Sequence, residues 1–499
     1  MLGYARQNPT REEWQTTGKL LMLALPLLWV WSHNQVFMWD DFAHRLPSLV
    51  FVTTFDSLPR VGLPASFSDF PSYPYALTLL GLAVNRLLGY YNELAIAIVN
   101  GALLVSLAGF TAQLLTKPDK SPSWKVMAAS LLAVTLLCPV FQGKLVASAY
   151  QDAALGWSLA VAWVLIYLLL KKKELPHWQA TLAIGLTLAL VTTLKQVGLV
   201  LAVMLVLPFI AWQTYQYRHS PHRVALFSIL LMLPLILIWL AWRYYIATNI
   251  GGGEFSFLPW VQWQWHLWPD MLVSLGKVTV QKPFVVLPLL VVTGLTVVAW
   301  RKPKLANLKL SFLLASLVGW GYLVFLMVTY IGSFSEYEAT RLASFSRYMQ
   351  HVNWMLWLAC LLAAKEVGLV QKFEKSHRAG YIALGLLFVP LAIPYHFIGK
   401  ANAEAIQMRR LAKVLPDYLP ANQNLVLRVE EPQGSGFRGK ALQYYVGFGY
   451  RLQNGSTKFG GDTNSGQADG FLTLDAVDKP VTLQRCHANV CQTFTITLP

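Results

Sequence analysis

Two adjacent carboxylates, Asp40 and Asp41, directly follow the first long apolar segment of the chain and precede His44 and Arg45. Charged groups beside a lipid bilayer are costly, and they usually mark the path of a substrate or an ion. A carboxylate in such a place can remove a proton from a nucleophile. The structural alternative is that both acids sit in a wet loop just past a helix end, where a charge costs little.

Other ionisable and tyrosine side chains at the ends of apolar segments could complete a site around this pair. They are Tyr150, Asp152, Lys195, Arg341, Arg347 and Tyr348. If the segment ends converge, several fixed cations would face the carboxylates. That arrangement suits a reaction in which a carboxylate takes a proton and cations hold a departing phosphate. Each cation taken singly is also explained by a long side chain that reaches the lipid headgroups.

The composition is that of a membrane protein. Of 499 residues, 55% are hydrophobic and only 13% are charged, whereas a soluble domain carries about 25% charged residues. Long apolar runs recur between residues 20 and 398, each long enough to cross the roughly 30 Å of bilayer hydrocarbon. The formal charge of +16 lies in short Lys and Arg clusters between these runs. Such clusters follow the positive-inside rule and argue against a nucleic-acid-binding protein, which would present a continuous basic face.

We predict a polytopic bundle of about eleven transmembrane helices. They cover 20–38, 93–115, 126–142, 152–170, 178–194, 197–212, 224–246, 284–300, 310–330, 350–364 and 379–398. With a cytoplasmic N-terminus, the Lys and Arg clusters fall on the cytoplasmic side, and the opposite loops hold fewer basic residues, mostly single ones. If the moderately apolar segment 75–88 were counted as a span, all later Lys and Arg clusters would lie on the outer side. We therefore expect this segment to lie along the membrane surface. The segments predicted on the outer side are 39–91, 143–151, 247–283, 331–349 and everything after 399.

The chain is expected to divide into a membrane domain, residues 1–398, and a small soluble α/β domain, residues 399–499. The first outer loop, 39–91, belongs to the membrane domain and is expected to hold interface helices. In the soluble domain, residues 400–415 have the pattern of an amphipathic helix. Alternating segments predict strands at 424–430, 441–450 and, in part, 481–498. Gly- and Asn-rich stretches predict loops at 453–456 and 460–462.

Two of the four cysteines, Cys486 and Cys491, lie in this soluble domain with four residues between them. Their strand-like flanks make a hairpin, in which the pair is close enough for a disulfide that would persist in an oxidising compartment. A metal site is the weaker alternative, because only His487 is nearby and a structural zinc takes four ligands. Cys138 and Cys360 lie in apolar spans and are expected to behave as small inert hydrophobes.

The sequence resembles the GT-C glycosyltransferases, membrane enzymes that use polyprenyl-phosphate sugars as donors. The resemblance is strongest to the bacterial protein O-mannosyltransferases, lipid A aminoarabinose transferases and arabinofuranosyltransferases. It rests on the acidic pair after the first span, on a Pro-rich segment at 70–75 in a long first outer loop, on the Tyr150-x-Asp152 pattern, and on Arg347-Tyr348 before a late span. It covers the whole architecture, including a soluble domain after the last span, although its motifs are short.

The resemblance implies an inverting glycosyltransferase in a bacterial inner membrane. It would move a sugar from undecaprenyl or another polyprenyl phosphate to a hydroxyl of a periplasmic glycan, glycolipid or protein. The pair Asp40 and Asp41 would be catalytic, and Asp40 matches the family's base by position, although Asp-Asp in place of the commoner Asp-Glu leaves the choice open. Lys195, Arg347 and Arg341 would bind the donor phosphate, and His44, Tyr150, Asp152 and Tyr348 would contact sugar or acceptor. No cofactor is expected to be required, with a divalent cation as the alternative.

Two other kinds of protein act on lipid-linked sugars. A flippase or transporter should carry charged residues at mid-bilayer depth, often on broken helices, whereas these spans are uncharged in their middles. An O-antigen polymerase or ligase uses a pyrophosphate leaving group and has large late outer loops rich in Arg and His. The largest loop between spans here is the first one, and it carries acids. The first comparison favours an enzyme, and the second favours a monophosphate donor.

Overall fold

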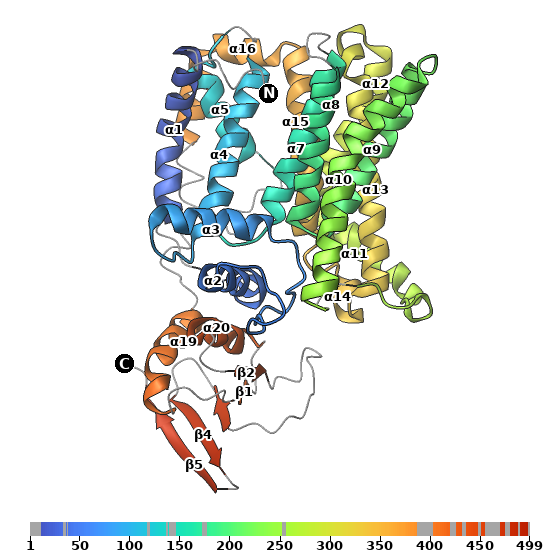
Figure 1. Ribbon diagram of the computed structural model, residues 1–499. Coiled ribbons are helices and arrows are strands. Elements are labelled where there is room, and N and C mark those ends of the chain that lie inside the picture. Colours follow the sequence, from blue (N-terminus) through green and yellow to red (C-terminus); the bar gives the residue numbers. More distant parts are fainter. Residues whose placement is uncertain are drawn as a thin grey trace.

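A bundle of helices with a small sheet beyond one end forms the molecule (Figure 1). The computed structural model describes residues 11–32, 36, 38–116, 120–135, 138, 146–171, 177–251, 256–386, 403–419, 426–431, 436–447, 451–454, 470–474, 480–487 and 490–497.

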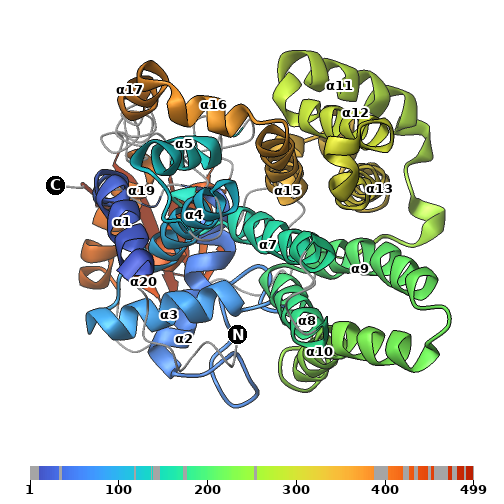
Figure 2. The ribbon, with the colours of Figure 1, turned by 90° about the horizontal axis from the view of Figure 1, so that it is seen from above.

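A helix lies at each of the eleven predicted spans, as far as the described residues extend. These helices are α1 (Arg11–Ser32), α4 (Ala95–Leu115), α5 (Trp124–Val134), α7 (Asp152–Lys171), α8 (His177–Leu194), α9 (Val197–Gln216), α10 (Pro221–Asn249), α12 (Leu287–Arg301), α13 (Lys309–Ser333), α15 (Phe345–Glu366) and α17 (His377–Leu386). In Figure 1 they stand side by side, and Figure 2 looks down on the same bundle. The chain is therefore a polytopic α-helical protein, as predicted.

The described helices differ in how well they meet the requirements of a span. By length and apolarity α4, α7, α9, α10 and α13 could each cross a membrane, and α15 joined to α16 (Leu369–Lys375) through a 71° bend is a sixth candidate. The described parts of α5, α8 and α12 are apolar but shorter, and those of α1 and α17 fall in neither group. The apolar windows of α4 and α7 are 61% and 72% buried inside the molecule, and helices in such surroundings are expected to be hydrophobic all round.

The first outer loop forms short helices at one end of the bundle, which we call the site end (the lower end in Figure 1). The π-helical turn η2 (Asp41–Arg45) leads into α2 (Leu46–Phe55), and α3 (Ala76–Leu88) follows. As predicted for an interface helix, α3 runs across the direction of the bundle helices (Figures 1 and 2). It packs tightly on α4, because a Cβ atom added to Gly81 would lie 2.8 Å from Ile96 Cγ1.

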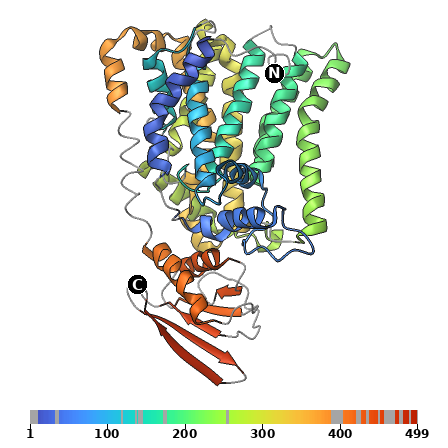
Figure 3. The ribbon, with the colours of Figure 1, turned by 60° about the vertical axis from the view of Figure 1, so that its left-hand side comes forward.

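The other segments predicted on the outer side also form short elements. They are the turns η3 (Trp260–Gln262) and η4 (Trp265–Leu267), α11 (Trp268–Gln281), η5 (Pro283–Val285) and α14 (Glu336–Arg341), while η6 (Pro303–Leu308) joins α12 to α13. Beyond the site end lie α19 (Ala403–Val414), η7 (Leu415–Asp417), α20 (Phe437–Val446) and the sheet (Figure 3). The boundary predicted between residues 398 and 399 falls outside the described residues.

The sheet has five strands in the order β2-β1-β3-β4-β5. These are β1 (Val426–Glu430), β2 (Arg451–Asn454), β3 (Gly470–Thr473), β4 (Val481–His487) and β5 (Val490–Ile496). β1 is parallel to β2 and β3, while β3 pairs with β4 and β4 with β5 in antiparallel fashion. The helix α19, the strand β1 and the β4–β5 hairpin confirm the elements predicted at 400–415, 424–430 and 481–498.

Two predictions in this region were wrong. The segment 441–450, predicted as a strand, lies mostly in the helix α20, which buries Phe437, Ala441 and Tyr444 on one face. The reason is topological: parallel strands β1 and β2 need a crossover connection, and a helix usually supplies it. The predicted loop 453–456 is partly strand, because β2 extends to Asn454. The predicted loop 460–462 lies outside the described residues.

Candidate active site

Asp41 begins the π-helical turn η2, whose residues are all buried, and Asp40 directly precedes this turn. Such turns are rare and are often found at functional sites. The side chain of Asp40 is 28% exposed, whereas Asp41 is completely buried. The Asp41 carboxyl accepts hydrogen bonds from the backbone N–H of Ala149 at 2.9 Å and of Met38 at 3.3 Å. Asp41 therefore ties the acidic turn to the segment before α7, while Asp40 faces accessible space.

Burial also separates the two acids electrostatically. It raises the pKa of Asp41 to about 8, and the negative charge of Asp40 acts in the same direction. At neutral pH the Asp41 carboxyl is thus mostly protonated. Burial of one of two neighbouring acids is one way in which a site gives two carboxyl groups separate roles.

Arg347, near the start of α15, joins the acidic turn to the rest of the cluster. Its guanidinium donates to Asp40 Oδ2 at 2.8 Å and to the Tyr348 hydroxyl at 3.0 Å, and lies 4.9 Å from the centre of the Tyr150 ring. The turn before it holds Leu342 and Ser344 in left-handed conformations, with φ of 47° and 61°. Such strain in residues other than glycine is common at functional sites.

A second, deeper group is centred on Asp152 at the start of α7. Its Oδ1 accepts from Lys195 Nζ at 2.9 Å and from His351 Nε2 at 2.7 Å. Since the carboxylate can only accept, Nε2 donates, and His351 Nδ1 then accepts from the Tyr322 hydroxyl at 2.6 Å. In the row Lys195–Asp152–His351–Tyr322, the Asp152 carboxylate is held by Lys195 on one side and by His351 on the other.

Positive charge exceeds negative charge around these acids. Lys195, in the turn between α8 and α9, lies 5.2 Å from the centre of the Tyr348 ring. Arg45 is 8% exposed, lies 5.2 Å from the centre of the Tyr73 ring, and is attracted by both Asp40 and Asp152. With Asp41 protonated, three described cations, Lys195, Arg347 and Arg45, face two carboxylates. A site with this balance attracts an anion.

His44 lies in an aromatic wall beside the pair. Its ring centre is 5.8 Å from that of Trp39, 4.7 Å from Phe70 and 6.2 Å from Tyr73. Burial lowers the pKa of His44 to about 3, so the ring is neutral. Among the described residues its Nδ1 atom has no hydrogen-bond partner. The side chain thus offers an apolar edge together with one free polar atom.

The structure brings most of the predicted site residues together. Those in the cluster are Asp40, Asp41, Tyr150, Asp152, Lys195, Arg347 and Tyr348, with His44 beside it. Arg341 is exposed on α14 and donates to the Tyr337 hydroxyl at 2.6 Å, so it lies apart from this network. His351 and Tyr322 also belong to the cluster, although they were not among the predicted site residues. The spacing of His351 four residues after Arg347, on the same face of α15, was the available signal.

An apolar groove reaches Thr193, near the end of α8. It lies between α8 and α10 and has a volume of about 510 Å³. Its lining residues are Leu186, Ala189, Leu190, Thr193, Pro234, Leu237, Ile238 and Ala241. Thr193 lies two residues before Lys195 in the chain.

The C-terminal helices contact the turn that carries the acids. The Phe42 ring packs edge-on against Phe437 and Tyr444 of α20, with ring centres 5.4 and 5.5 Å apart. Lys440 forms an ion pair with Asp69 of the first loop. In the sheet, Cys486 is directly opposite Cys491 across the β4–β5 hairpin. Both cysteine side chains lie outside the described part of the chain, so the disulfide stays a prediction.

The described residues contain no group of three or more His, Cys, Asp or Glu side chains that could hold a metal ion.

Comparison with known proteins identifies the fold. No protein-family model and no curated protein matches the sequence. The chain is similar to ArnT, an aminoarabinose transferase from Cupriavidus metallidurans, in the apo state (TM-score 0.54, 12% identity, 88% of this chain and 86% of ArnT covered) and bound to undecaprenyl phosphate (TM-score 0.53, 11% identity, 89% and 86% covered). The archaeal oligosaccharyltransferase AglB from Archaeoglobus fulgidus, with an inhibitory peptide and a dolichol-phosphate, gives a TM-score of 0.43 at 9% identity, covering 88% of this chain and 64% of AglB. The chain has the GT-C fold, as its motifs predicted.

Proposed function

We propose that the protein is a glycosyltransferase that moves a sugar from a polyprenyl-phosphate donor to a hydroxyl group of an acceptor. The observation that carries this proposal is the pairing of an accessible carboxylate, Asp40, with Arg347 inside a cluster that has an excess of positive charge. The GT-C fold supports it, and one of the similar ArnT structures is bound to undecaprenyl phosphate.

The groove and the cations fit the two parts of such a donor. The groove between α8 and α10 would take the polyprenyl tail, since its lining is apolar. The phosphate would then lie near Lys195 and Arg347, with Arg45 as a third cation. Fixed cations stabilise the charge that develops on a departing phosphate.

Asp40 is the base in this mechanism because Asp41 is inaccessible and mostly protonated. The donor phosphate competes with Asp40 for the Arg347 guanidinium, which frees the carboxylate to accept the proton of the acceptor hydroxyl. The acceptor oxygen forms a bond to the anomeric carbon as the bond from that carbon to the phosphate oxygen breaks. Polyprenyl phosphate leaves with the electron pair, and the configuration at the anomeric carbon inverts.

The remaining residues position these groups. Asp41 holds the acidic turn against Ala149, and His351 and Tyr322 hold Asp152 beside Lys195. His44, Tyr150 and Tyr348 are available to the sugar or the acceptor. We place the site on the periplasmic side of a bacterial inner membrane, with the N-terminus in the cytoplasm, because this orientation agrees with the positive-inside rule.

The test is release of polyprenyl phosphate by the purified protein in nanodiscs, supplied with a panel of polyprenyl-phosphate sugars and an envelope extract as acceptor. We expect Asp40→Asn to lower turnover by about 10² to 10⁴, the usual range for a lost general base. Arg341→Gln is the matched control, because Arg341 lies apart from the cluster, and its turnover should equal that of the wild type. Equal turnover of Asp40→Asn and wild type, or a large loss in Arg341→Gln alone, would refute the assignment.

A further inference from the structure

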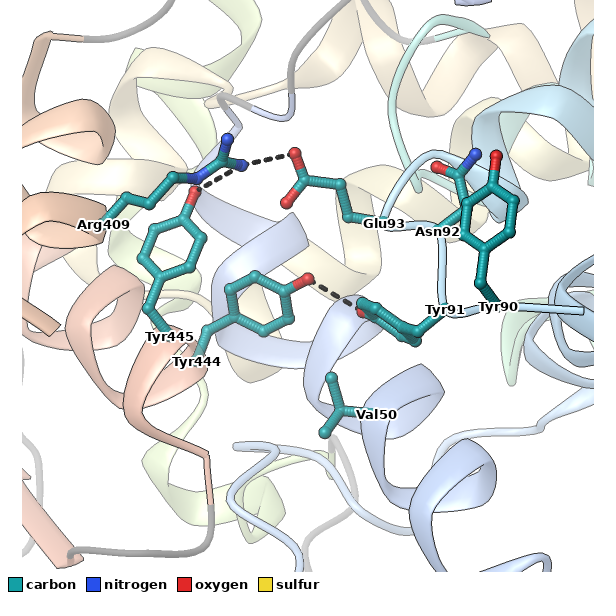
Figure 4. A pocket seen from close by; sticks show the side chains of 8 residues that line it. All are labelled: Val50, Tyr90, Tyr91, Asn92, Glu93, Arg409, Tyr444 and Tyr445. Atoms are coloured by element: carbon teal, nitrogen blue, oxygen red, sulfur yellow. Dashed lines mark hydrogen bonds and ion pairs between the residues drawn. The ribbon is translucent and has the colours of Figure 1, made fainter. Parts of the chain in front are cut away.

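A second hollow lies where the C-terminal helices meet the first outer loop. It has a volume of about 500 Å³, within the usual range of small-ligand sites. Figure 4 shows its lining residues: Val50, Tyr90, Tyr91, Asn92, Glu93, Arg409, Tyr444 and Tyr445. They come from α2, from the segment between α3 and α4, from α19 and from α20. None of these residues takes part in the chemistry proposed above.

Four tyrosines and three other polar side chains give this hollow a distinctive chemistry. Some of its polar groups bind one another: Tyr91 and Tyr444 share a hydrogen bond of 2.8 Å between their hydroxyls, and Arg409 reaches Glu93 Oε1 at 2.5 Å (Figure 4). Others have no hydrogen-bond partner within the part of the chain that the structure describes. These are the Tyr90 hydroxyl, the second carboxylate oxygen of Glu93 and the side-chain amide nitrogen of Asn92.

Aromatic faces are also open to a ligand. Tyr90 is 60% exposed and Tyr91 is 38% exposed. Burying a tyrosine ring against a partner is favourable, so both rings can gain contact area when a ligand binds. The loop that carries them is held in place, because Asn92 Oδ1 accepts from the Leu94 N–H at 2.8 Å and the Asn92 N–H donates to Asn85 Oδ1 at 3.0 Å. The hollow thus presents rigid rings and free polar atoms that are ordered before a ligand arrives.

We propose that this hollow binds a saccharide unit. A sugar ring has an apolar C–H face that stacks on an aromatic ring, and a rim of hydroxyls that both donate and accept hydrogen bonds. Tyr90 and Tyr91 supply rings, while Glu93 and Asn92 supply an acceptor and a donor. A purely apolar ligand would leave the Arg409–Glu93 pair buried and poorly solvated, which is unfavourable. A free phosphate would be repelled by the Glu93 carboxylate, because both are negatively charged.

The hollow shares a wall with the acidic turn. The rings of Tyr444 and Tyr445 pack on Phe42, with ring centres 5.5 and 5.8 Å away, and Phe42 directly follows Asp41. A glycan bound here would therefore lie beside the reaction centre. Resting on the function proposed above, we assign the bound saccharide to the acceptor, at a sugar unit other than the one that is modified.

The test measures binding of the full-length protein in nanodiscs to an array that carries maltotetraose, cellotetraose and chitotetraose beside a set of peptides. We expect binding to at least one tetrasaccharide, weakened at least tenfold by Tyr90→Ala and by Glu93→Gln. Tyr244→Ala is the matched control, because Tyr244 is 73% exposed but lies on α10, away from the hollow; it should bind like the wild type.

Asp40→Asn separates this proposal from the proposed catalytic function, since it should lower turnover as stated above and leave saccharide binding unchanged. Three results would overturn the saccharide site. They are no binding to any of the three tetrasaccharides, binding to peptides only, and binding that Tyr90→Ala and Glu93→Gln leave at the wild-type level.

Discussion

The replacement Asp152→Asn tests whether the deeper group of the site is a coupled buried ion pair. The side chains of Asp152 and Lys195 are 3% and 17% exposed, and their atoms lie 2.9 Å apart. Removing one partner of a buried pair costs about 3–5 kcal/mol, because the other charge stays buried without compensation. Asparagine has nearly the same shape, so the loss would come from the charge and not from the packing.

The expected loss of stability has two parts, one from weakened hydrogen bonds and one from the buried charge. Lys195 and His351 both donate to the same oxygen of Asp152, Oδ1, and an asparagine oxygen could still accept both. Hydrogen bonds to a charged group contribute about 1.5–3 kcal/mol and neutral ones about 1 kcal/mol, so weakening two bonds costs about 2 kcal/mol. The uncompensated Lys195 ammonium accounts for the rest of an expected loss of about 3–4 kcal/mol.

The assay is the free energy of unfolding in mixed micelles, obtained by titration with SDS and followed by circular dichroism. Lys195→Met and the double variant complete a mutant cycle, and we expect the double variant to be more stable than Asp152→Asn. Glu366→Gln is the matched control, because the Lys171–Glu366 pair has a similar distance, 2.6 Å, but side chains 34% and 25% exposed; its loss should stay below about 1 kcal/mol. An Asp152→Asn loss no larger than this control, or strictly additive effects in the cycle, would refute the reasoning.

Three further predictions concern titration, the cysteines and metal. Because burial raises the pKa of Asp41 from 3.8 to about 8, its protonated form stabilises the fold; this stabilisation is complete below pH 3.8 and is lost as the pH rises through 8. The wild type should thus lose up to about 1.4 kcal/mol per pH unit between pH 5 and 8 relative to Asp41→Asn, measured by unfolding at each pH, and a constant difference would show that Asp41 is already ionised. Alkylation of the denatured protein should modify two cysteines without reductant and four after reduction, and Cys486→Ser should lower stability by about 2 kcal/mol, the value for so short a loop; four modified cysteines without reductant would exclude the disulfide. EDTA should leave turnover unchanged, because Lys195, Arg347 and Arg45 supply the positive charge at the phosphate, and activity that EDTA abolishes and Mg²⁺ restores would contradict this assignment.

Much of the architecture could be predicted from local patterns. An apolar run long enough to cross a bilayer has to form a helix there, since only internal hydrogen bonds can satisfy its backbone in lipid. The surface orientation of α3 followed from the distribution of Lys and Arg along the chain. The strand predicted at 441–450 failed because a short alternating segment also fits a helix, and only the parallel pairing of β1 with β2 makes a crossover helix necessary.

The candidate site could also be predicted only in part from the sequence. The residue types and their placement at span ends determined that a carboxylate pair, several cations and tyrosines lie at one end of the bundle. Sequence position could not show which acid is exposed, since Asp40 and Asp41 are neighbours of one type. The contact of Asp41 with Ala149, 108 residues away, decides it by burying one carboxyl group. Similarly, Arg341 and Arg347 look alike in sequence, but only Arg347 meets Asp40.

The sequence by itself determined the membrane bundle, the interface helix and the residue types of the site, because these depend on local hydrophobicity and on charge between spans. Tertiary structure alone decided the protonation of Asp41, the row from Lys195 to Tyr322, and the hollow between the first loop and α20. Each of these depends on burial and on contacts between segments far apart in the chain, and neither quantity is encoded in local spacing.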